Sequence, residues 1–261
     1  MIKNSKNGFD HFKRPNPFFI IIVLFIFSFS QLNMSWGKLL DSFERGKYML
    51  NRMLPPRFDE PLNLLEAAVE SLQVAVVGTI LGIIMSTVLA VLAAKNLTPH
   101  PLISYSIKMF AAFVRAVPAL IWAILFIIAV GFGPTPGILA LAVNSIGMLV
   151  KVYAESIEEM DMATIEAVRS TGASPLQVIF QGVFPSIMSI FITWSIFRFD
   201  INVRYAAVLG VVGAGGIGWV LLSAVKSSRL DAALGATFVI FALIISIEYI
   251  TRFIKRQLEN I

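Results

Sequence analysis

Long apolar runs, separated by short polar segments with proline or glycine, dominate this chain of 261 residues. Six of the runs predict membrane-spanning helices, because a span needs ~20 predominantly apolar residues. These six runs are 17–34, 71–94, 117–131, 137–153, 186–210 and 233–251. The pattern therefore predicts an all-α, polytopic transmembrane protein.

Composition agrees with this class. Hydrophobic residues make up 57% of the chain and charged residues 14%, and the mean hydropathy is +0.80. A soluble globule of this composition would expose too much apolar surface. Cysteine is absent and histidine occurs only at His11 and His100, so no disulfide, thiol chemistry, cofactor or metal site is expected.

The first apolar run has two interpretations. It follows a basic stretch and could be a secretory signal, but no small-residue cleavage site comes after it. We interpret it as an uncleaved anchor. The chain then divides into an anchor with an external segment (1–70), a membrane core (71–251) and a cytoplasmic tail (252–261).

The distribution of lysine and arginine predicts the orientation, because these residues are in excess on the cytoplasmic side of a membrane. With the N-terminus inside, the inside segments hold twelve Lys and Arg and the outside segments hold seven. The inside segments are 1–16, 95–116, 151–185 and 252–261. Both termini are therefore expected in the cytoplasm, with 35–70 outside.

The fifth predicted span carries four polar residues: Arg198, Asp200, Asn202 and Arg204. Ionisable groups at bilayer depth are costly, so they pair with each other or face a polar cavity. Spacing by four puts Arg198 with Asn202 on one helix face and Asp200 with Arg204 on another. Asp200 can simply neutralise Arg204. Arg198 has no such local partner, and a guanidinium suits a passing oxyanion.

Segment 154–185 contains a predicted helix–turn–helix. Asp161 can cap a helix over 162–170, Gly172 suits the left-handed position after it, and Ser174 with Pro175 can start another helix. Acidic residues outnumber basic ones here, which argues against nucleic-acid binding. A solvent-exposed acidic loop is the plain alternative.

This segment resembles the cytoplasmic signature of membrane subunits in ATP-binding-cassette importers. The signature has Glu-Ala-Ala, a glycine four residues after the last alanine and a proline thirteen beyond it. Here Glu166-Ala167-Val168, Gly172 and Pro185 have that spacing. The departures are Val168 for the third alanine and Gly182 for the usual isoleucine. The resemblance implies that Glu166, Ala167 and Gly172 contact the ATPase.

The chain resembles the phosphonate-transport permeases in particular, over about residues 66–251. The matching segments are 115–126, 131–142, 166–178, 198–204 and 212–218. The resemblance implies a type I importer permease that moves phosphonate, or a related phosphorus oxyanion, across the bacterial inner membrane. It also implies a homodimer, separate ATP-binding-cassette ATPase subunits and an external solute-binding protein. Arg198, Asn202, Asp200 and Arg204 would then belong to the substrate path.

Two other functions stay open. A permease of the same architecture could carry an amino acid or another solute, although the polar set at 198–204 argues against this. An intramembrane lipid-modifying enzyme is the more distant alternative, since paired histidines and a clustered acid–base set are missing. Gly213–Gly218 fits G-x-G-x-x-G but lacks the strand–helix context of a dinucleotide site, and a close-packed or bent glycine turn is expected instead. No P-loop motif occurs, so ATP hydrolysis requires a partner.

Overall fold

The computed structural model describes residues 17–32 and 36–259, and within these ranges it is helical without strands. Contacts divide the chain into two units, 1–52 and 53–261. The division lies inside the segment 1–70 that the sequence groups together.

The first unit holds two helices. α1 (Pro17–Gln31) has 15 residues, most of them apolar and all exposed within the unit. At ~1.5 Å per residue it is about 22 Å long, short of the ~30 Å hydrocarbon layer. Positions 33 and 34 of the predicted first span lie outside the described residues. α2 (Trp36–Met53) has apolar residues at helical spacing opposite charged ones, so this part of segment 35–70 is an amphipathic helix.

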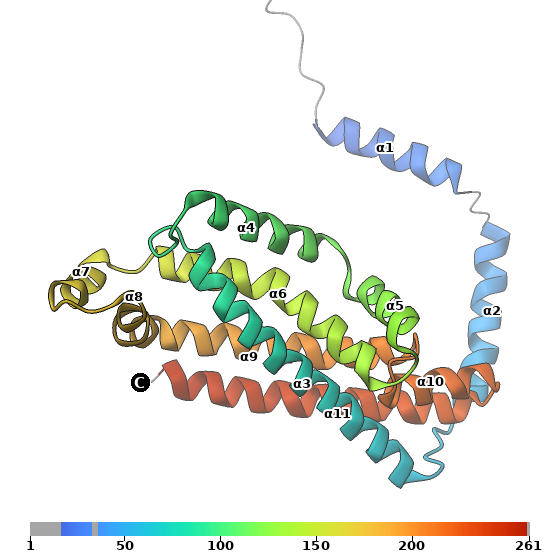
Figure 1. The fold of residues 1–261 in the computed structure, drawn as a ribbon. Helices are drawn as coiled ribbons and strands as arrows, with labels where there is room; N and C mark the ends of the chain where they lie inside the picture. Colours follow the sequence, from blue (N-terminus) through green and yellow to red (C-terminus); the bar gives the residue numbers. More distant parts are fainter. Residues whose placement is uncertain (1–16, 33–35, 260–261) are drawn as a thin grey trace, which may run out of the picture. The chain divides into compact units, whose positions relative to one another are not determined.

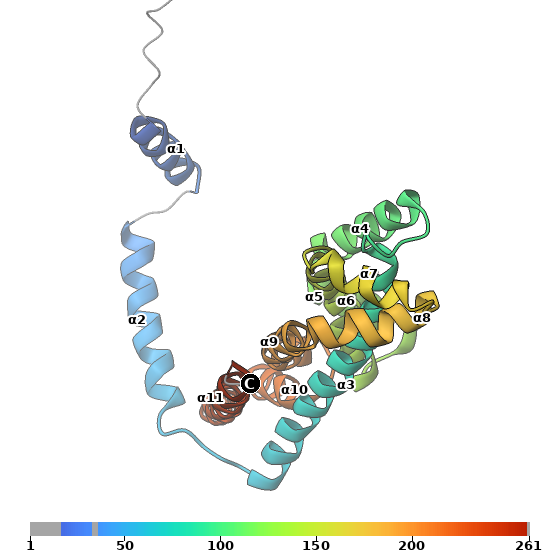
Figure 2. The same cartoon turned by 90° about the vertical axis from the view of Figure 1, so that its left-hand side faces the viewer.

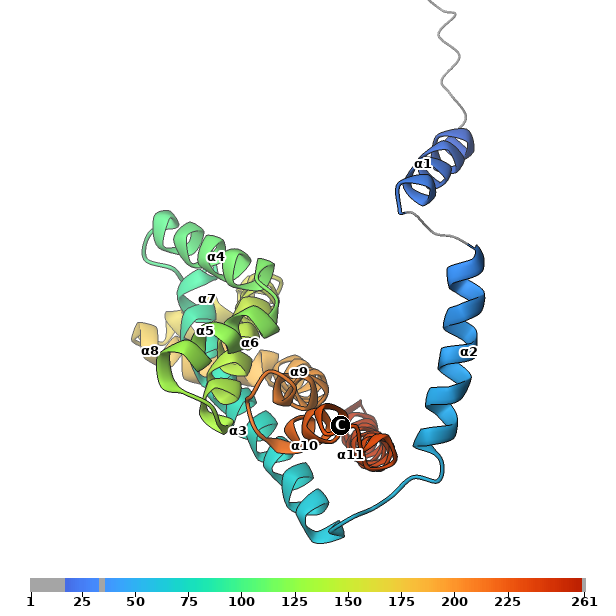
Figure 3. The same cartoon turned by 90° about the vertical axis from the view of Figure 1, so that its right-hand side faces the viewer.

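The second unit is a helical bundle in which α3, α6 and α9 form the centre (Figures 1 and 2). α11 packs against α9 and α10 (Figure 3). In chain order its elements are α3 (Pro61–Ala93), α4 (Pro101–Ala116), α5 (Ala119–Val130), α6 (Pro134–Glu158), α7 (Met162–Ser170), α8 (Pro175–Gln177), the π-helix η1 (Val178–Val183), α9 (Phe184–Gly210), α10 (Gly216–Lys226) and α11 (Leu230–Glu259).

Four helices of the described chain are long and apolar enough to cross a membrane, and a fifth crossing is possible for a bent pair. The four are α3, α6, the continuous helix 175–210 and α11. The sequence predicts six spans, and the described residues contain four or five helical segments of that kind. The long helices also begin before the predicted limits: α3 starts at Pro61 and not at 71.

The predicted third span, 117–131, is not a continuous helix of spanning length. Its helical part, α5, has 12 residues and meets α4 at an angle of 91°. Val117 is extended (φ −89°, ψ 121°), as a residue before proline tends to be, and Pro118 has no N–H to continue the ladder. α4 was predicted to belong to an inside loop, but it is a helix packed on α6.

Two glycines bring α3 and α6 unusually close. A Cβ at Gly78 would lie 2.8 Å from the Leu141 Cβ, and one at Gly82 would lie 2.5 Å from the Ser145 Cβ. Their four-residue spacing is the small-xxx-small pattern that lets membrane helices pack backbone to backbone.

The bundle has two ends. At the α7 end, the Asn96 side chain donates to the Ile157 carbonyl at 2.7 Å, and Ile165 of α7 is fully buried. At the α10 end, the Gly133 N–H donates to the Gly213 carbonyl at 3.1 Å, and Arg57 donates to the Asp231 carbonyl. Segments 95–100 and 159–174 therefore lie at the same end, as the charge distribution predicts.

Candidate functional site

Arg198 and Asn202 of α9 lie at a junction with α3 and α6, away from solvent. Arg198 is 4% exposed and Asn202 is fully buried. The guanidinium donates through Nε to the Ser145 hydroxyl at 2.9 Å and through Nη2 to the Asn144 side-chain oxygen. The Asn202 amide donates to Ser145 at 3.0 Å and to Thr79 at 2.8 Å. We call these five residues the polar junction.

The two hydroxyls of the polar junction are oriented as acceptors. Ser145 donates its proton to the Leu141 carbonyl at 2.6 Å, and Thr79 donates to the Ala75 carbonyl at 2.6 Å. Their lone pairs therefore remain for Arg198 and Asn202. The Asn202 Oδ1 atom is buried and accepts no hydrogen bond from the residues that the structure describes.

The Arg198 charge has only neutral partners among the described residues. Besides Asn144 and Ser145, its Nη1 atom lies 3.8 Å from the Met148 sulfur, and no carboxylate lies within ion-pair distance. A buried charge normally has an opposite charge beside it. The junction therefore holds a positive charge that an anion could complement.

Asp200 and Arg204 form the ion pair that their spacing predicts, at 2.8 Å. Arg204 also lies 3.4 Å from Glu248 of α11, which in turn pairs with Arg252. The Arg204 side chain is 49% exposed, so this pair lies on the more open face of α9. Sequence spacing located the pair but could not place Glu248, which is distant in the chain.

The helix–turn–helix of segment 154–185 has the predicted local chemistry. Asp161 caps α7 by accepting from the Ala163 N–H at 2.9 Å, and Gly172 has φ +80°. Ser174 and Gln177 form a capping box, with Pro175 in the first turn of α8. The π-helix that joins α8 to α9 was not predicted.

α7 presents the signature residues outward. Glu166, Ala167 and Gly172 are exposed, while Ile165 is buried among residues of α6 and η1. The two departures from the signature face each other: a Cβ on Gly182 would lie 3.4 Å from the Val168 Cγ2 atom. The larger residue at 168 thus occupies the space that the smaller residue at 182 leaves free.

The glycine-rich segment 213–218 is a turn followed by the first residues of α10. Gly213, Gly215 and Gly216 have positive φ, and the turn lies against α3. The first N–H groups of α10 donate to α3: Gly216 to the Glu70 carboxylate at 3.1 Å and Ile217 to the Ser71 hydroxyl at 2.9 Å. This is the bent, close-packed turn that the sequence favours over a dinucleotide site.

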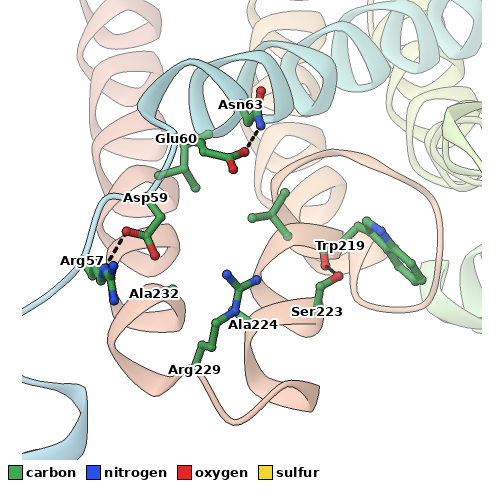
Figure 4. A pocket seen from close by; sticks show the side chains of 11 residues that line it. Arg57, Asp59, Glu60, Asn63, Trp219, Ser223, Ala224, Arg229 and Ala232 are labelled. Carbon is green, nitrogen blue, oxygen red and sulfur yellow. Dashed lines mark hydrogen bonds and ion pairs between the residues drawn. The ribbon is translucent and has the colours of Figure 1, made fainter.

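A cavity of about 310 Å³ opens at the α10 end (Figure 4). Arg57 pairs with Asp59 at 2.6 Å, Glu60 accepts from Asn63, and Arg229 points between them. Two arginines and two carboxylates balance here, so this cavity has no preference for anions.

Sequence reasoning missed the α3 and α6 members of the polar junction. Thr79, Asn144 and Ser145 are polar residues within apolar runs, and this was the sequence signal that could have identified them. Only the fold shows that all three meet Arg198 and Asn202.

An apolar bundle whose described residues include four helices long enough to cross a membrane defines a multi-pass membrane protein. The profile of the family described as "Binding-protein-dependent transport system inner membrane component" matches residues 78–260. The chain belongs to this family.

Two relatives are similar over most of this chain. The "Phosphate-import permease protein PhnE" of Mycolicibacterium smegmatis is 44% identical over 220 residues, 84% of this chain and 41% of the relative. The chain thus spans less than half of that relative. The "Phosphite transport system permease protein PtxC" of Stutzerimonas stutzeri is 34% identical over 85% of this chain and 80% of its own length.

Solved structures support the fold. The MetNI methionine ABC transporter, in an inward-facing conformation, has a chain with a TM-score of 0.65 at 19% identity, covering 77% of this chain and 99% of its own. A chain of an amino acid ABC transporter has a TM-score of 0.60 at 16% identity, covering 78% of this chain and all of its own. The fold is that of type I importer permeases.

Proposed function

We propose that this permease imports a phosphorus oxyanion: a phosphonate, phosphite, phosphate or phosphate ester. The observation that carries the proposal is the buried Arg198, whose donors are held by neutral oxygens. An oxyanion offers the same hydrogen bonds together with the missing negative charge. The names of the two relatives, a phosphate-import and a phosphite permease, agree with this chemistry.

In this proposal Arg198 and Asn202 meet the substrate when α9 moves relative to α3 and α6. Asp200 and Arg204 hold α9 beside that path. The Asn202 Oδ1 atom, without a donor in the described structure, can accept from a protonated oxyanion. The low dielectric of a dry bundle makes these contacts stronger than they would be in water.

The rest of the assembly follows from the family resemblance. Two copies of the chain pair as a homodimer, two ATPase subunits bind at Glu166, Ala167 and Gly172 of the α7 region, and an external binding protein delivers the solute. Both termini and α7 then lie in the cytoplasm of a bacterial cell. ATP binding moves α7, and the helices alternate access to the path.

The test is uptake by the reconstituted complex of permease, ATPase and binding protein. Labelled phosphate, phosphite and methylphosphonate are compared with methionine, each counted per folded transporter. Arg198→Ala should abolish uptake of the phosphorus anion, and Arg198→Lys should restore little because an ammonium lacks the guanidinium fork. The control is Arg256→Ala, which removes an exposed cation of α11.

Two results would contradict the proposal. Uptake of methionine without any phosphorus anion would reject the substrate class. Near-normal uptake by Arg198→Ala would show that Arg198 only ties α9 to α6.

A further inference from the structure

A second cavity, of about 380 Å³, lies at the α7 end among the segment after α3, α4 and α6. Unlike the cavity of Figure 4, its wall has an excess of cations. It is lined by Lys95, Lys108, Arg115 and Lys151 against two carboxylates, Glu155 and Glu158. We call it the basic cavity.

The two carboxylates of the basic cavity are already engaged. Glu158 pairs with Lys108 at 2.6 Å and accepts from the Lys95 backbone N–H at 2.8 Å. Glu155 pairs with Lys151 at 3.6 Å across one helical turn, with both side chains about half exposed. Among the described residues, no carboxylate pairs with the side chains of Lys95 or Arg115. The cavity therefore keeps a net positive charge.

Small residues form the wall of the basic cavity where α4 meets α6. A Cβ on Gly147 would lie 2.8 Å from the Arg115 backbone nitrogen, so glycine lets the end of α4 approach α6. Ala111 and Ala112 form the neighbouring wall. The close approach brings the Arg115 side chain to the same cavity as Lys151.

One face of α6 connects this cavity with the polar junction. Asn144, Met148, Lys151 and Glu155 follow one another at spacings of four, three and four, and so share a helix face. Asn144 and Met148 contact the Arg198 guanidinium, and Lys151 and Glu155 line the basic cavity. From Asn144 to Lys151 the helix rises about 10 Å.

We propose that the basic cavity is the next binding station of the translocated phosphorus oxyanion, between Arg198 and the α7 end. Arg115 and Lys95 bind it directly, and Lys151 adds charge. The proposal rests on the proposed function, because it extends the same substrate path. A phospholipid headgroup presents the same phosphate chemistry, so the experiment has to separate the two sources.

The experiment uses the full complex in proteoliposomes of phosphatidylcholine, with and without phosphatidylglycerol. Arg115→Gln and Lys95→Gln should each lower uptake of labelled phosphate or phosphite about tenfold at low substrate, the loss expected for one charge-assisted hydrogen bond. Arg115→Lys should restore most of it, since the cavity attracts by charge. Arg256→Gln, which removes an exposed cation outside the cavity, should leave uptake unchanged.

The wild-type complex must first be shown to import the phosphorus anion, and its failure to do so would reject the proposed function instead. Given that import, equal losses in both lipid mixtures support the basic cavity as a substrate station. A loss confined to vesicles with phosphatidylglycerol would assign it to lipid headgroups and overturn the proposal. Normal uptake by both glutamine variants would also overturn it.

Discussion

Ser145 is the residue on which the polar junction depends. It accepts from both Arg198 and Asn202, so its loss leaves two buried donors short of a partner. Hydrogen bonds between membrane helices contribute about 0.6–2 kcal/mol each. The junction thus stabilises the crossing of α6 and α9 as well as holding the charge.

We expect Ser145→Ala to lower the thermal unfolding midpoint in detergent. The matched control is Ser86→Ala on α3, because Ser86 is also fully buried but its hydroxyl has no partner among the described residues. Removing it should be neutral or slightly stabilising. Equal midpoints for the two variants would mean that the hydrogen bonds of Ser145 contribute nothing to stability.

Individual residues were predictable where the chemistry is local. Spacing by four located the Asp200–Arg204 pair, and capping rules located Asp161 and Gly172. The partners of Arg198 were not predictable, because Ser145 is 53 residues away in the chain and meets it only through helix packing.

At the scale of elements, the close crossing of α3 and α6 follows from Gly78 and Gly82. Gly82→Ala would place a Cβ 2.5 Å from the Ser145 Cβ, so the helices would have to separate. Overpacking of this kind costs about 1–3 kcal/mol. It should lower the unfolding midpoint and reduce uptake, because Ser145 moves with α6.

Gly46→Ala is the control for this variant, since nothing lies within 4 Å of a Cβ at Gly46 in its helix. It should leave the midpoint unchanged or raise it slightly, because alanine favours helix. A Gly82→Ala protein with normal stability and uptake would show that the glycine spacing is incidental.

Val168 and Gly182 should behave as a coupled pair. Gly182→Ile restores the residue usual in the signature, but its side chain would overlap Val168, so α7 should be displaced and ATPase co-purification should fall. Adding Val168→Ala should recover the complex. Residues in contact typically show coupling of about 0.5–3 kcal/mol. Additive effects in the double variant would contradict the compensation.

For the whole molecule, hydropathy predicted the class correctly but not the bend between α4 and α5. Hydropathy measures the length of an apolar run and not the direction of its helix axis. The pattern therefore assigned a full span to α5 and left α4 in a loop. The 91° bend at Pro118 joins the two. The start of α3 at Pro61 was missed because its early turns carry Glu66 and Glu70.

Topology remains a prediction that labelling can test, helped by the absence of cysteine. A single cysteine at Arg256 should react only with reagents that reach the cytoplasm, and one at Lys226 only with external reagents. Both positions are exposed in the structure. The opposite result would invert the orientation and place α7 outside the cell, where no ATPase could bind it.

The attachment of α7 sets how it can move. Of its nine residues, only Ile165 is fully buried, and Val168 packs on the bundle from a partly buried position. Opening free energies within one protein range from near zero to the global value, according to how much each segment buries. The amides of α7 should therefore exchange with deuterium well before those of α6, whose buried residues anchor the bundle. A bound ATPase would slow that exchange at α7, which makes deuterium uptake at this helix a direct measure of docking.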